Sequence, residues 1–134
     1  MILVDTNVLL DLVTDDPNWA DWSIAQLEAA SLRGPLLIND VVYAELAVRY
    51  GRIEELEAFV GEAGLEIVPI PRAALFLAGK VFMQYRRSGG SRTGVLPDFF
   101  IGAQAAVSQL TLLTRDVGRY RTYFPSLTLI TPGI

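Results

Sequence analysis

Two aspartates, Asp98 and Asp116, are the only acidic residues among residues 67–134, where eight basic residues stand. Each lies beside the boundary of a predicted element rather than on a charged surface helix. Two acids of the first half occupy similarly unusual positions: Asp5 directly follows a short apolar segment, and Glu45 interrupts an apolar helical stripe. Four carboxylates at one edge would repel one another unless cations held them, and oxygen ligands select Mg²⁺ or Mn²⁺. These residues therefore predict a site for a hard divalent ion.

The residue types that the chain lacks narrow the chemistry further. Its 134 residues include neither histidine nor cysteine. Without histidine, Ser-His-Asp triads, paired-histidine RNA cleavage and ordinary zinc hydrolysis are excluded, and without cysteine so are disulfides and thiolate metal sites. Any hydrolytic reaction must use carboxylates, hydroxyls, amides, arginine, the single lysine Lys80 or a hard metal ion.

The net charge of −4 is unevenly distributed along the chain. Residues 1–66 hold thirteen acids against three arginines, whereas residues 67–134 hold eight basic residues against two acids. The basic half could contact phosphates, or its arginines could simply decorate a solvated face. Apolar residues make up 51% of the chain, which predicts exposed apolar surface and a protein partner. No segment has the features of a membrane span or a signal peptide, so we expect a cytoplasmic protein.

The acids must be positioned by alternating short strands and helices. The length predicts one domain over residues 1–134, and short apolar strands between helices predict an α/β fold with a mostly parallel sheet of four to five strands and helices on both faces. Residues 88–94 form a polar, glycine-rich loop that we expect to be mobile. The predicted strands are residues 2–4, 36–38, 66–69, 111–114 and 127–130, and the predicted helices are residues 7–13, 19–32, 40–50, 52–63, 73–87 and 97–108.

This fold predicts where the acids lie. Asp5 and Asp116 follow strands, so both belong at the carboxyl edge of the sheet, where ligands bind in such folds. Asp98 opens its helix, and Gly102 one turn later removes a side chain from the same face, which predicts room for an ion or a backbone. Glu45 lies between Val41, Val42 and Val48 on an apolar stripe, where a carboxylate needs a partner.

Each acid also has a purely structural interpretation. Asp5 and Asp116 could cap the helices that follow them, Asp98 could complement a helix dipole, and Glu45 could be peripheral. The chain would then be a non-catalytic binding module. Asp5 after a strand could instead be the nucleophile of a small phosphatase, although such enzymes need a second acid where Asn7 stands. Ordinary turn and cap roles are likewise open to Thr6, Asn7, Asn39 and Thr114.

Four segments carry a family resemblance in order and spacing. Residues 2–10 (ILVDTNVLL) resemble the opening motif of PIN domains, and residues 39–46 (NDVVYAEL) resemble the segment with their second acid. Residues 96–103 (LPDFFIGA) are the most specific match, and residues 113–116 (LTRD) followed by Tyr120 are similar to the closing motif. Gln104 stands where many relatives have histidine, Tyr120 where phenylalanine is common, and Asn39 where serine often precedes the second acid.

The resemblance implies a metal-dependent endoribonuclease that is similar to VapC toxins of toxin–antitoxin pairs. It implies that Mg²⁺ or Mn²⁺ is held by Asp5, Glu45 and Asp98 with help from Asp116, and that RNA phosphodiesters are hydrolysed. It also implies an antitoxin partner and a homodimer. Thr6, Asn7 and Thr114 would hold the carboxylates in place. From their places near the loop or the rim, the candidate phosphate contacts are Arg86, Arg87, Arg92, Arg115 and Arg119.

Overall fold

The computed structural model describes residues 1–92 and 94–133, and these form a five-stranded parallel sheet surrounded by helices. The strand order is β3-β2-β1-β4-β5, with Leu3 beside Leu37 on one side and Leu112 on the other. The α/β fold predicted from the sequence is confirmed. The strands are β1 (Ile2–Val4), β2 (Leu36–Ile38), β3 (Leu65–Ile67), β4 (Thr111–Leu113) and β5 (Leu129–Ile130).

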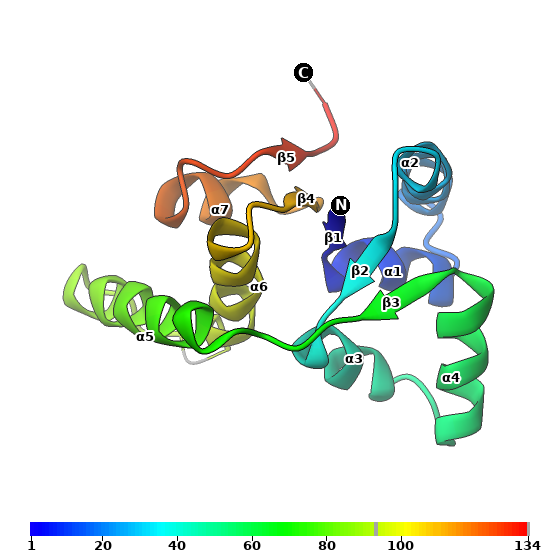
Figure 1. Cartoon of the computed structure of the whole chain (residues 1–134), viewed down its shortest axis with the longest axis horizontal. Coiled ribbons are helices and arrows are strands. Elements are labelled where there is room, and N and C mark those ends of the chain that lie inside the picture. Colours follow the sequence, from blue (N-terminus) through cyan, green and yellow to red (C-terminus); the bar gives the residue numbers. More distant parts are fainter. Residues whose placement is uncertain (93, 134) are drawn as a thin grey trace.

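The central strands consist of apolar residues because both faces of the sheet are covered. All residues of β1 and β2 are buried, as expected for parallel strands between two helical layers. Figure 1 shows α2 on one side of the sheet and α5 and α6 on the other. The helices are α1 (Thr6–Val13), α2 (Ala20–Ser31), α3 (Asp40–Ala47), α4 (Ile53–Glu62), α5 (Arg72–Arg87), α6 (Leu96–Val107) and α7 (Val117–Tyr123).

Local sequence explains where the functional helices begin. The Asn39 side chain accepts a hydrogen bond from the backbone N–H of Val42 and caps α3. Pro97 lies in the first turn of α6, where its missing N–H costs no hydrogen bond. The helix after Asn39 ends at Ala47, earlier than predicted, so Val48 is exposed and does not extend an apolar stripe past Glu45.

Aromatic rings fill the space between α5, α6 and α7. Phe99 is fully buried and packs edge-on against Tyr85, Tyr123 and Phe124. The Phe124 ring lies against Gly102, where an added Cβ would come within 2.6 Å of it. The prediction that Gly102 leaves room for an ion is therefore wrong, because an aromatic ring fills this space. Gly102 instead allows α7 to approach α6 closely.

The loop between α5 and α6 folds back on α5. Gly90 lies against the Tyr85 ring, and the Tyr85 hydroxyl accepts a hydrogen bond from the backbone N–H of Arg92 at 3.1 Å. Of the loop predicted at residues 88–94, Thr93 lies outside the described residues, as does Ile134 of the predicted domain. No helix in the described part of the chain is long and apolar enough to cross a membrane.

Candidate metal and nucleic-acid site

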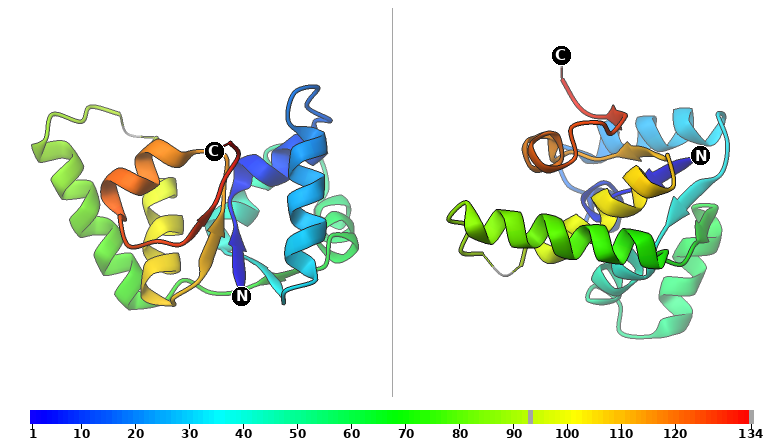
Figure 2. Two further views of the ribbon diagram at one scale, coloured as in Figure 1. Left: turned by 90° about the horizontal axis from the view of Figure 1, so that it is seen from above. Right: turned by 60° about the vertical axis from the view of Figure 1, so that its left-hand side comes forward.

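The four predicted acids come from elements that meet at the carboxyl edge of the sheet. Asp5 follows β1, Asp116 lies beyond β4, and Asp98 is in the first turn of α6. In the left panel of Figure 2 this edge is uppermost, and the start of α6 and the end of α5 lie along it. Glu45 reaches the same edge from α3, since it accepts a hydrogen bond from Thr6 at the start of α1.

Asp5 is buried and its two carboxylate oxygens have different roles. Oδ1 accepts the backbone N–H of Thr6 at 2.7 Å, which is the predicted capping contact. Oδ2 accepts the Thr114 hydroxyl at 2.7 Å and the Tyr120 hydroxyl at 3.1 Å. Burial raises the pKa of Asp5 to about 6, and the charge of Asp98 adds to the rise while these hydrogen bonds oppose it. Asp5 is thus a buried acid that has hydroxyl donors but no cationic partner among the described residues.

Glu45 is half-buried and is connected to the Asp5 segment. Its Oε1 accepts the Thr6 hydroxyl at 2.6 Å. Thr6 therefore orients Glu45 through its side chain while its backbone N–H binds Asp5. The predicted need of Glu45 for a partner is met by a neutral hydroxyl.

Asp98 and Asp116 are linked by an arginine. The Arg119 guanidinium donates to Asp98 Oδ2 and lies 3.9 Å from Asp116 Oδ2. Burial raises the pKa of Asp98 and Arg119 opposes the rise. The charges of Glu45 and Asp116 raise it further, so all these carboxylates act on one another. Asp116 makes no side-chain capping contact with α7, so the capping interpretation holds for Asp5 alone.

The donor set fits a hard divalent cation in its chemistry. Asp5, Glu45, Asp98 and Asp116 offer only carboxylate oxygens, and the hydroxyls around them are also oxygen donors. Within the described residues no three acids are close enough, as placed, to hold one ion. Asp98 is instead turned to Arg119. The residues suited to a metal are thus brought to one edge, with an arginine between two of them.

Each of the three polar residues predicted to support the acids, Thr6, Asn7 and Thr114, forms a hydrogen bond with one of them. The Thr114 hydroxyl donates to Asp5 and accepts the backbone N–H of Asp116 at 3.0 Å. Asn7 Nδ2 lies 3.4 Å from both Thr114 Oγ1 and Asp5 Oδ2, and its Oδ1 accepts the backbone N–H of Arg115. These bonds hold the β4–α7 connection against the start of α1. They also occupy Asp5 Oδ2, which disfavours a phosphatase nucleophile at this residue.

The five arginines proposed as phosphate contacts differ in their surroundings. Arg115 makes two hydrogen bonds to Asp11, at 2.7 and 2.8 Å, and stacks on the Trp19 ring. Arg119 is paired with Asp98, as described above. The other three, at the end of α5 and in the loop after it, are exposed. Figure 2 shows that this end of α5 lies on the side of the strands' carboxyl ends. These exposed arginines are Arg86, Arg87 and Arg92.

Two contacts near the site were not foreseen from the sequence. Tyr120 is fully buried and its hydroxyl donates to Asp5. From the sequence this residue was named only as part of the family resemblance, and no contact was predicted for it. Asn39 Nδ2 donates to Gln104 Oε1 at 2.9 Å, and Gln104 Nε2 donates to the Pro69 carbonyl. Both members of this buried pair depart from the resembled family pattern. The two residues that depart from the pattern therefore form a hydrogen bond with each other. They lie 65 residues apart in the chain, so the sequence alone did not indicate this contact.

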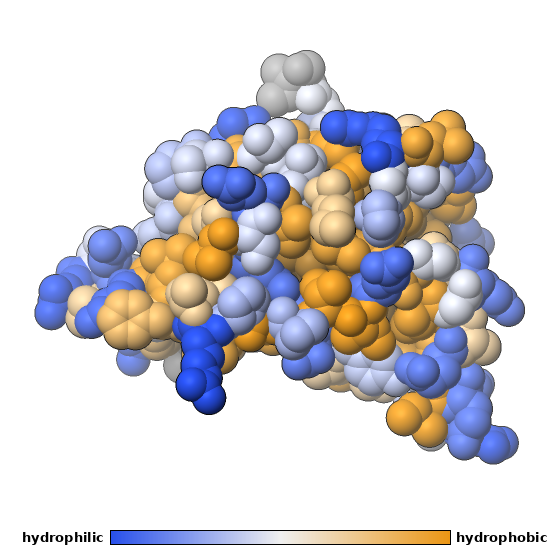
Figure 3. All heavy atoms as spheres, in the orientation of Figure 1, coloured by the Kyte–Doolittle hydropathy of each residue, from blue (hydrophilic) through white to orange (hydrophobic). Residues whose placement is uncertain are grey.

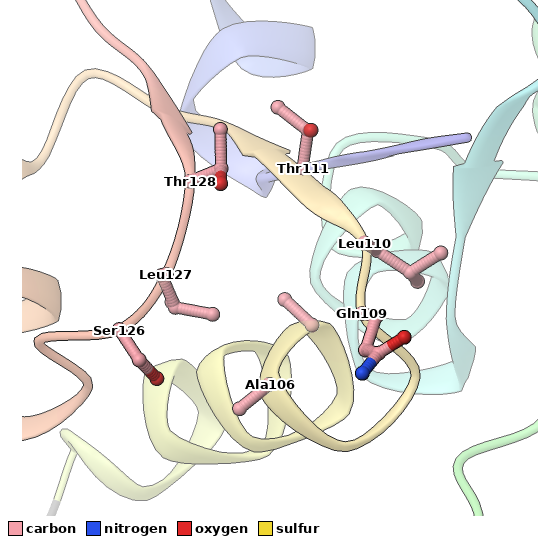
Figure 4. Close-up of a pocket in the computed structure, with 8 residues that line it drawn as sticks. Ala106, Gln109, Leu110, Thr111, Ser126, Leu127 and Thr128 are labelled. Carbon is pink, nitrogen blue, oxygen red and sulfur yellow. The ribbon is translucent and has the colours of Figure 1, made fainter.

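One hollow of the structure lies away from this edge. A cavity of about 340 Å³ is enclosed by α6, the start of β4 and the segment before β5 (Figure 4). Its lining includes Gln109, Thr111, Ser126 and Thr128 but no charged side chain. It lies at the amino end of β4, away from the carboxylates. The chemistry therefore points to the carboxyl edge rather than to this cavity.

The arrangement agrees with comparisons to known proteins. The family model of the PIN domain matches residues 2–125, nearly the whole chain. The chain belongs to the PIN domain family. No curated protein matches this PIN domain in sequence.

Solved structures share the fold. VapBC2 from Rickettsia felis, bound to a promoter DNA fragment, has a TM-score of 0.75 and 21% identity, covering 99% of this PIN domain and 100% of that chain. A toxin–antitoxin complex from Klebsiella pneumoniae has a TM-score of 0.68 and 22% identity, covering 99% and 98%. FitAcB from Neisseria gonorrhoeae has a TM-score of 0.69 and 21% identity, covering 97% and 96%. At these identities the likeness shows the PIN fold itself.

Proposed function

We propose that this PIN domain is an endoribonuclease that uses Mg²⁺ or Mn²⁺, and that it is the toxin of a toxin–antitoxin pair. The observation that carries the proposal is the convergence of Asp5, Glu45, Asp98 and Asp116 on one edge, in a chain without histidine or cysteine. A structural role explains this poorly, because only Asp5 caps a helix and Asp98 is flanked by two like charges.

The residues divide the work in a way that follows from their contacts. Asp5, Glu45 and Asp98 would hold the cation, and Asp116, whose side chain is 44% exposed, would assist it or orient water. A bound divalent cation supplies the Lewis acidity that offsets phosphate charge and makes water a stronger nucleophile. Thr6 and Thr114 hold Glu45 and Asp5 in place, and Asn7 fixes the connection that carries Asp116.

RNA would approach along the loop side of this edge. Arg86, Arg87 and Arg92 are exposed there and would contact phosphates without reading sequence. Arg119 lies among the acids and would reach a phosphate close to the bond that is cleaved. Arg115 is committed to Asp11, so we assign it a structural role in this proposal.

A protein partner and a second copy of the chain are part of the same proposal. Hydrophobic residues gather across the middle of the face shown in Figure 3. Large apolar side chains also remain exposed on several helices, which supports interfaces with an antitoxin and with another copy. The solved complexes with similar folds include toxin–antitoxin assemblies. These exposed side chains include Leu32, Val48, Ile53 and Phe76.

The direct test compares RNA cleavage by the wild type, Asp98→Asn and Asp40→Asn. Asp40 is an exposed acid on α3 and is not one of the four proposed ligands, so Asp40→Asn is the matched control for loss of one negative charge. We expect the wild type and Asp40→Asn to cut RNA at discrete positions only with Mg²⁺ or Mn²⁺. Asp98→Asn should lose at least about 100-fold in rate while remaining folded.

The same variants expressed in cells identify the substrate. Mapping the ends of cellular RNA should give discrete cuts and growth arrest with the wild type and with Asp40→Asn. Cleavage that persists in Asp98→Asn, or that does not need a divalent ion, would refute the proposed mechanism. Absence of divalent-ion binding in calorimetry would favour a non-catalytic binding module.

A further inference from the structure

Arg119 is the basic residue that contacts the predicted metal-binding acids. Its Nη1 donates to Asp98 Oδ2 and lies 3.9 Å from Asp116 Oδ2. In the described part of the chain no other basic side chain forms an ion pair with Asp5, Glu45, Asp98 or Asp116. The guanidinium therefore supplies positive charge at the place where the function requires a cation.

We propose that Arg119 is an exchangeable counter-ion, which neutralises Asp98 and Asp116 in the metal-free protein and leaves them when a divalent cation binds. The inference rests on the proposed function, because it assumes that Asp98 binds the cation. It adds a role for a residue of this chain in deciding how tightly that cation is held.

Arg119 and a divalent cation would compete for the lone pairs of the same carboxylate oxygen. Asp98 Oδ2, to which Arg119 donates, is a carboxylate oxygen that a metal would also use. A divalent ion beside the guanidinium would repel it, so the two cations cannot both stay close to this oxygen without cost. Since both bind the same group, removal of Arg119 must strengthen metal binding, and metal must weaken the Arg119–Asp98 pair.

The position of Arg119 allows it to leave. Its partner Asp98 has a side chain that is 25% exposed, whereas the side chain of Asp11, the partner of Arg115, is 3% exposed. Arg119 lies on the first turns of α7, at the rim, and its long side chain can turn toward solvent without disturbing the core. Once released, its donors are free for the RNA phosphate contact proposed above.

The test measures Mn²⁺ binding by calorimetry for the wild type, Arg119→Gln and Arg121→Gln. Arg121 lies two residues further along α7 and is exposed, so it is the matched control for loss of one positive charge. We expect Arg119→Gln to bind Mn²⁺ about tenfold more tightly than the wild type. Arg121→Gln should bind within about twofold of the wild type, because an exposed charge is screened.

A second measurement needs no substitution in the acids. The Nε–Hε resonance of Arg119 in the wild type, assigned by its loss in Arg119→Gln or Arg119→Lys, should shift during a Mg²⁺ titration with the midpoint of metal binding. The resonance of Arg115 should stay in place, since its partner Asp11 is not one of the proposed metal ligands.

The outcomes separate the two proposals. If the wild type binds Mn²⁺ and Arg119→Gln binds it no more tightly, the counter-ion role is wrong and the proposed function stands. If none of the three proteins binds Mn²⁺, the proposed function fails and takes the counter-ion role with it. Should Arg119→Gln not fold, an Arg119 resonance that is unmoved at saturating Mg²⁺ overturns the inference by itself.

Discussion

Asp5 directly precedes α1 and Asp11 lies within it, and the two residues are only 3% and 2% exposed. The surroundings of their charges are nevertheless opposite. Asp11 receives two hydrogen bonds from Arg115 and one from Ser23. Asp5 receives only neutral donors, and its pKa is raised to about 6. The difference shows that burial alone does not mark a functional acid. An acid that is buried without a cationic partner is the stronger candidate for a functional role.

Breaking the ion pair between Asp11 and Arg115 should have the largest effect on stability. Asp11→Ala leaves Arg115 without its partner and removes the acceptor of Ser23, so we expect the free energy of unfolding to fall by about 3 kcal/mol. Urea unfolding measures this. Asp21→Asn, an exposed change on α2, is the control and should alter stability little. A loss below about 1 kcal/mol for Asp11→Ala would mean that the pair contributes little.

Removing the charge of Asp5, which has no cationic partner, should raise the free energy of unfolding rather than lower it. The pKa of Asp5 in the folded protein, about 6, lies above the ordinary value of 3.8, so ionisation of Asp5 opposes folding. The stabilisation of the folded protein that comes from protonated Asp5 is fully present below pH 3.8 and is lost as the pH rises through about 6. Asp5→Asn should therefore stabilise the metal-free protein by about 2 kcal/mol at pH 7.5 and by close to nothing near pH 4.

The measurement for Asp5→Asn is urea unfolding across this pH range in the presence of a chelator. Saturating Mn²⁺ should reverse the order, because only the wild type retains the full set of ligands. Destabilisation of the metal-free variant at pH 7.5 would show that the hydrogen bonds to Asp5 outweigh its charge.

A smaller effect is expected from the Tyr120 hydroxyl. Tyr120→Phe keeps the buried ring and removes one donor from Asp5 Oδ2, so the pKa of Asp5 should rise further. We expect a loss of about 1 kcal/mol in unfolding free energy at pH 7.5. Tyr43→Phe removes an exposed hydroxyl contact with Glu57 and serves as the control. Equal effects of the two substitutions would contradict a specific role for Tyr120 at Asp5.

The smallest stability effect should come from Asp116. Its side chain is 44% exposed and lies 3.9 Å from Arg119, so Asp116→Asn should change the unfolding free energy by less than about 0.5 kcal/mol. Its RNA cleavage rate should nevertheless fall by at least about tenfold if Asp116 assists the cation. A stable variant with unchanged cleavage would remove Asp116 from the site.

The fold and the places of the acids were predictable because they depend on local patterns. Short apolar strands such as Ile2–Val4 and caps such as Asn39 specify elements within a few residues. The carboxyl ends of parallel strands then share one edge, which placed Asp5 and Asp116 together. Gly102 was assigned wrongly, because its neighbour Phe124 belongs to a distant segment.

The sequence by itself determined the available chemistry: an α/β domain with carboxylates as its only strong metal ligands. The tertiary structure decided which basic side chain pairs with which acidic side chain. Arg115 and Arg119 are alike in the sequence, yet one is held by Asp11, 104 positions away, and the other by Asp98. Such partners depend on how whole elements pack, since side chains far apart in the chain meet only when the core is formed. The difference between a structural arginine and an exchangeable one is therefore a property of the fold.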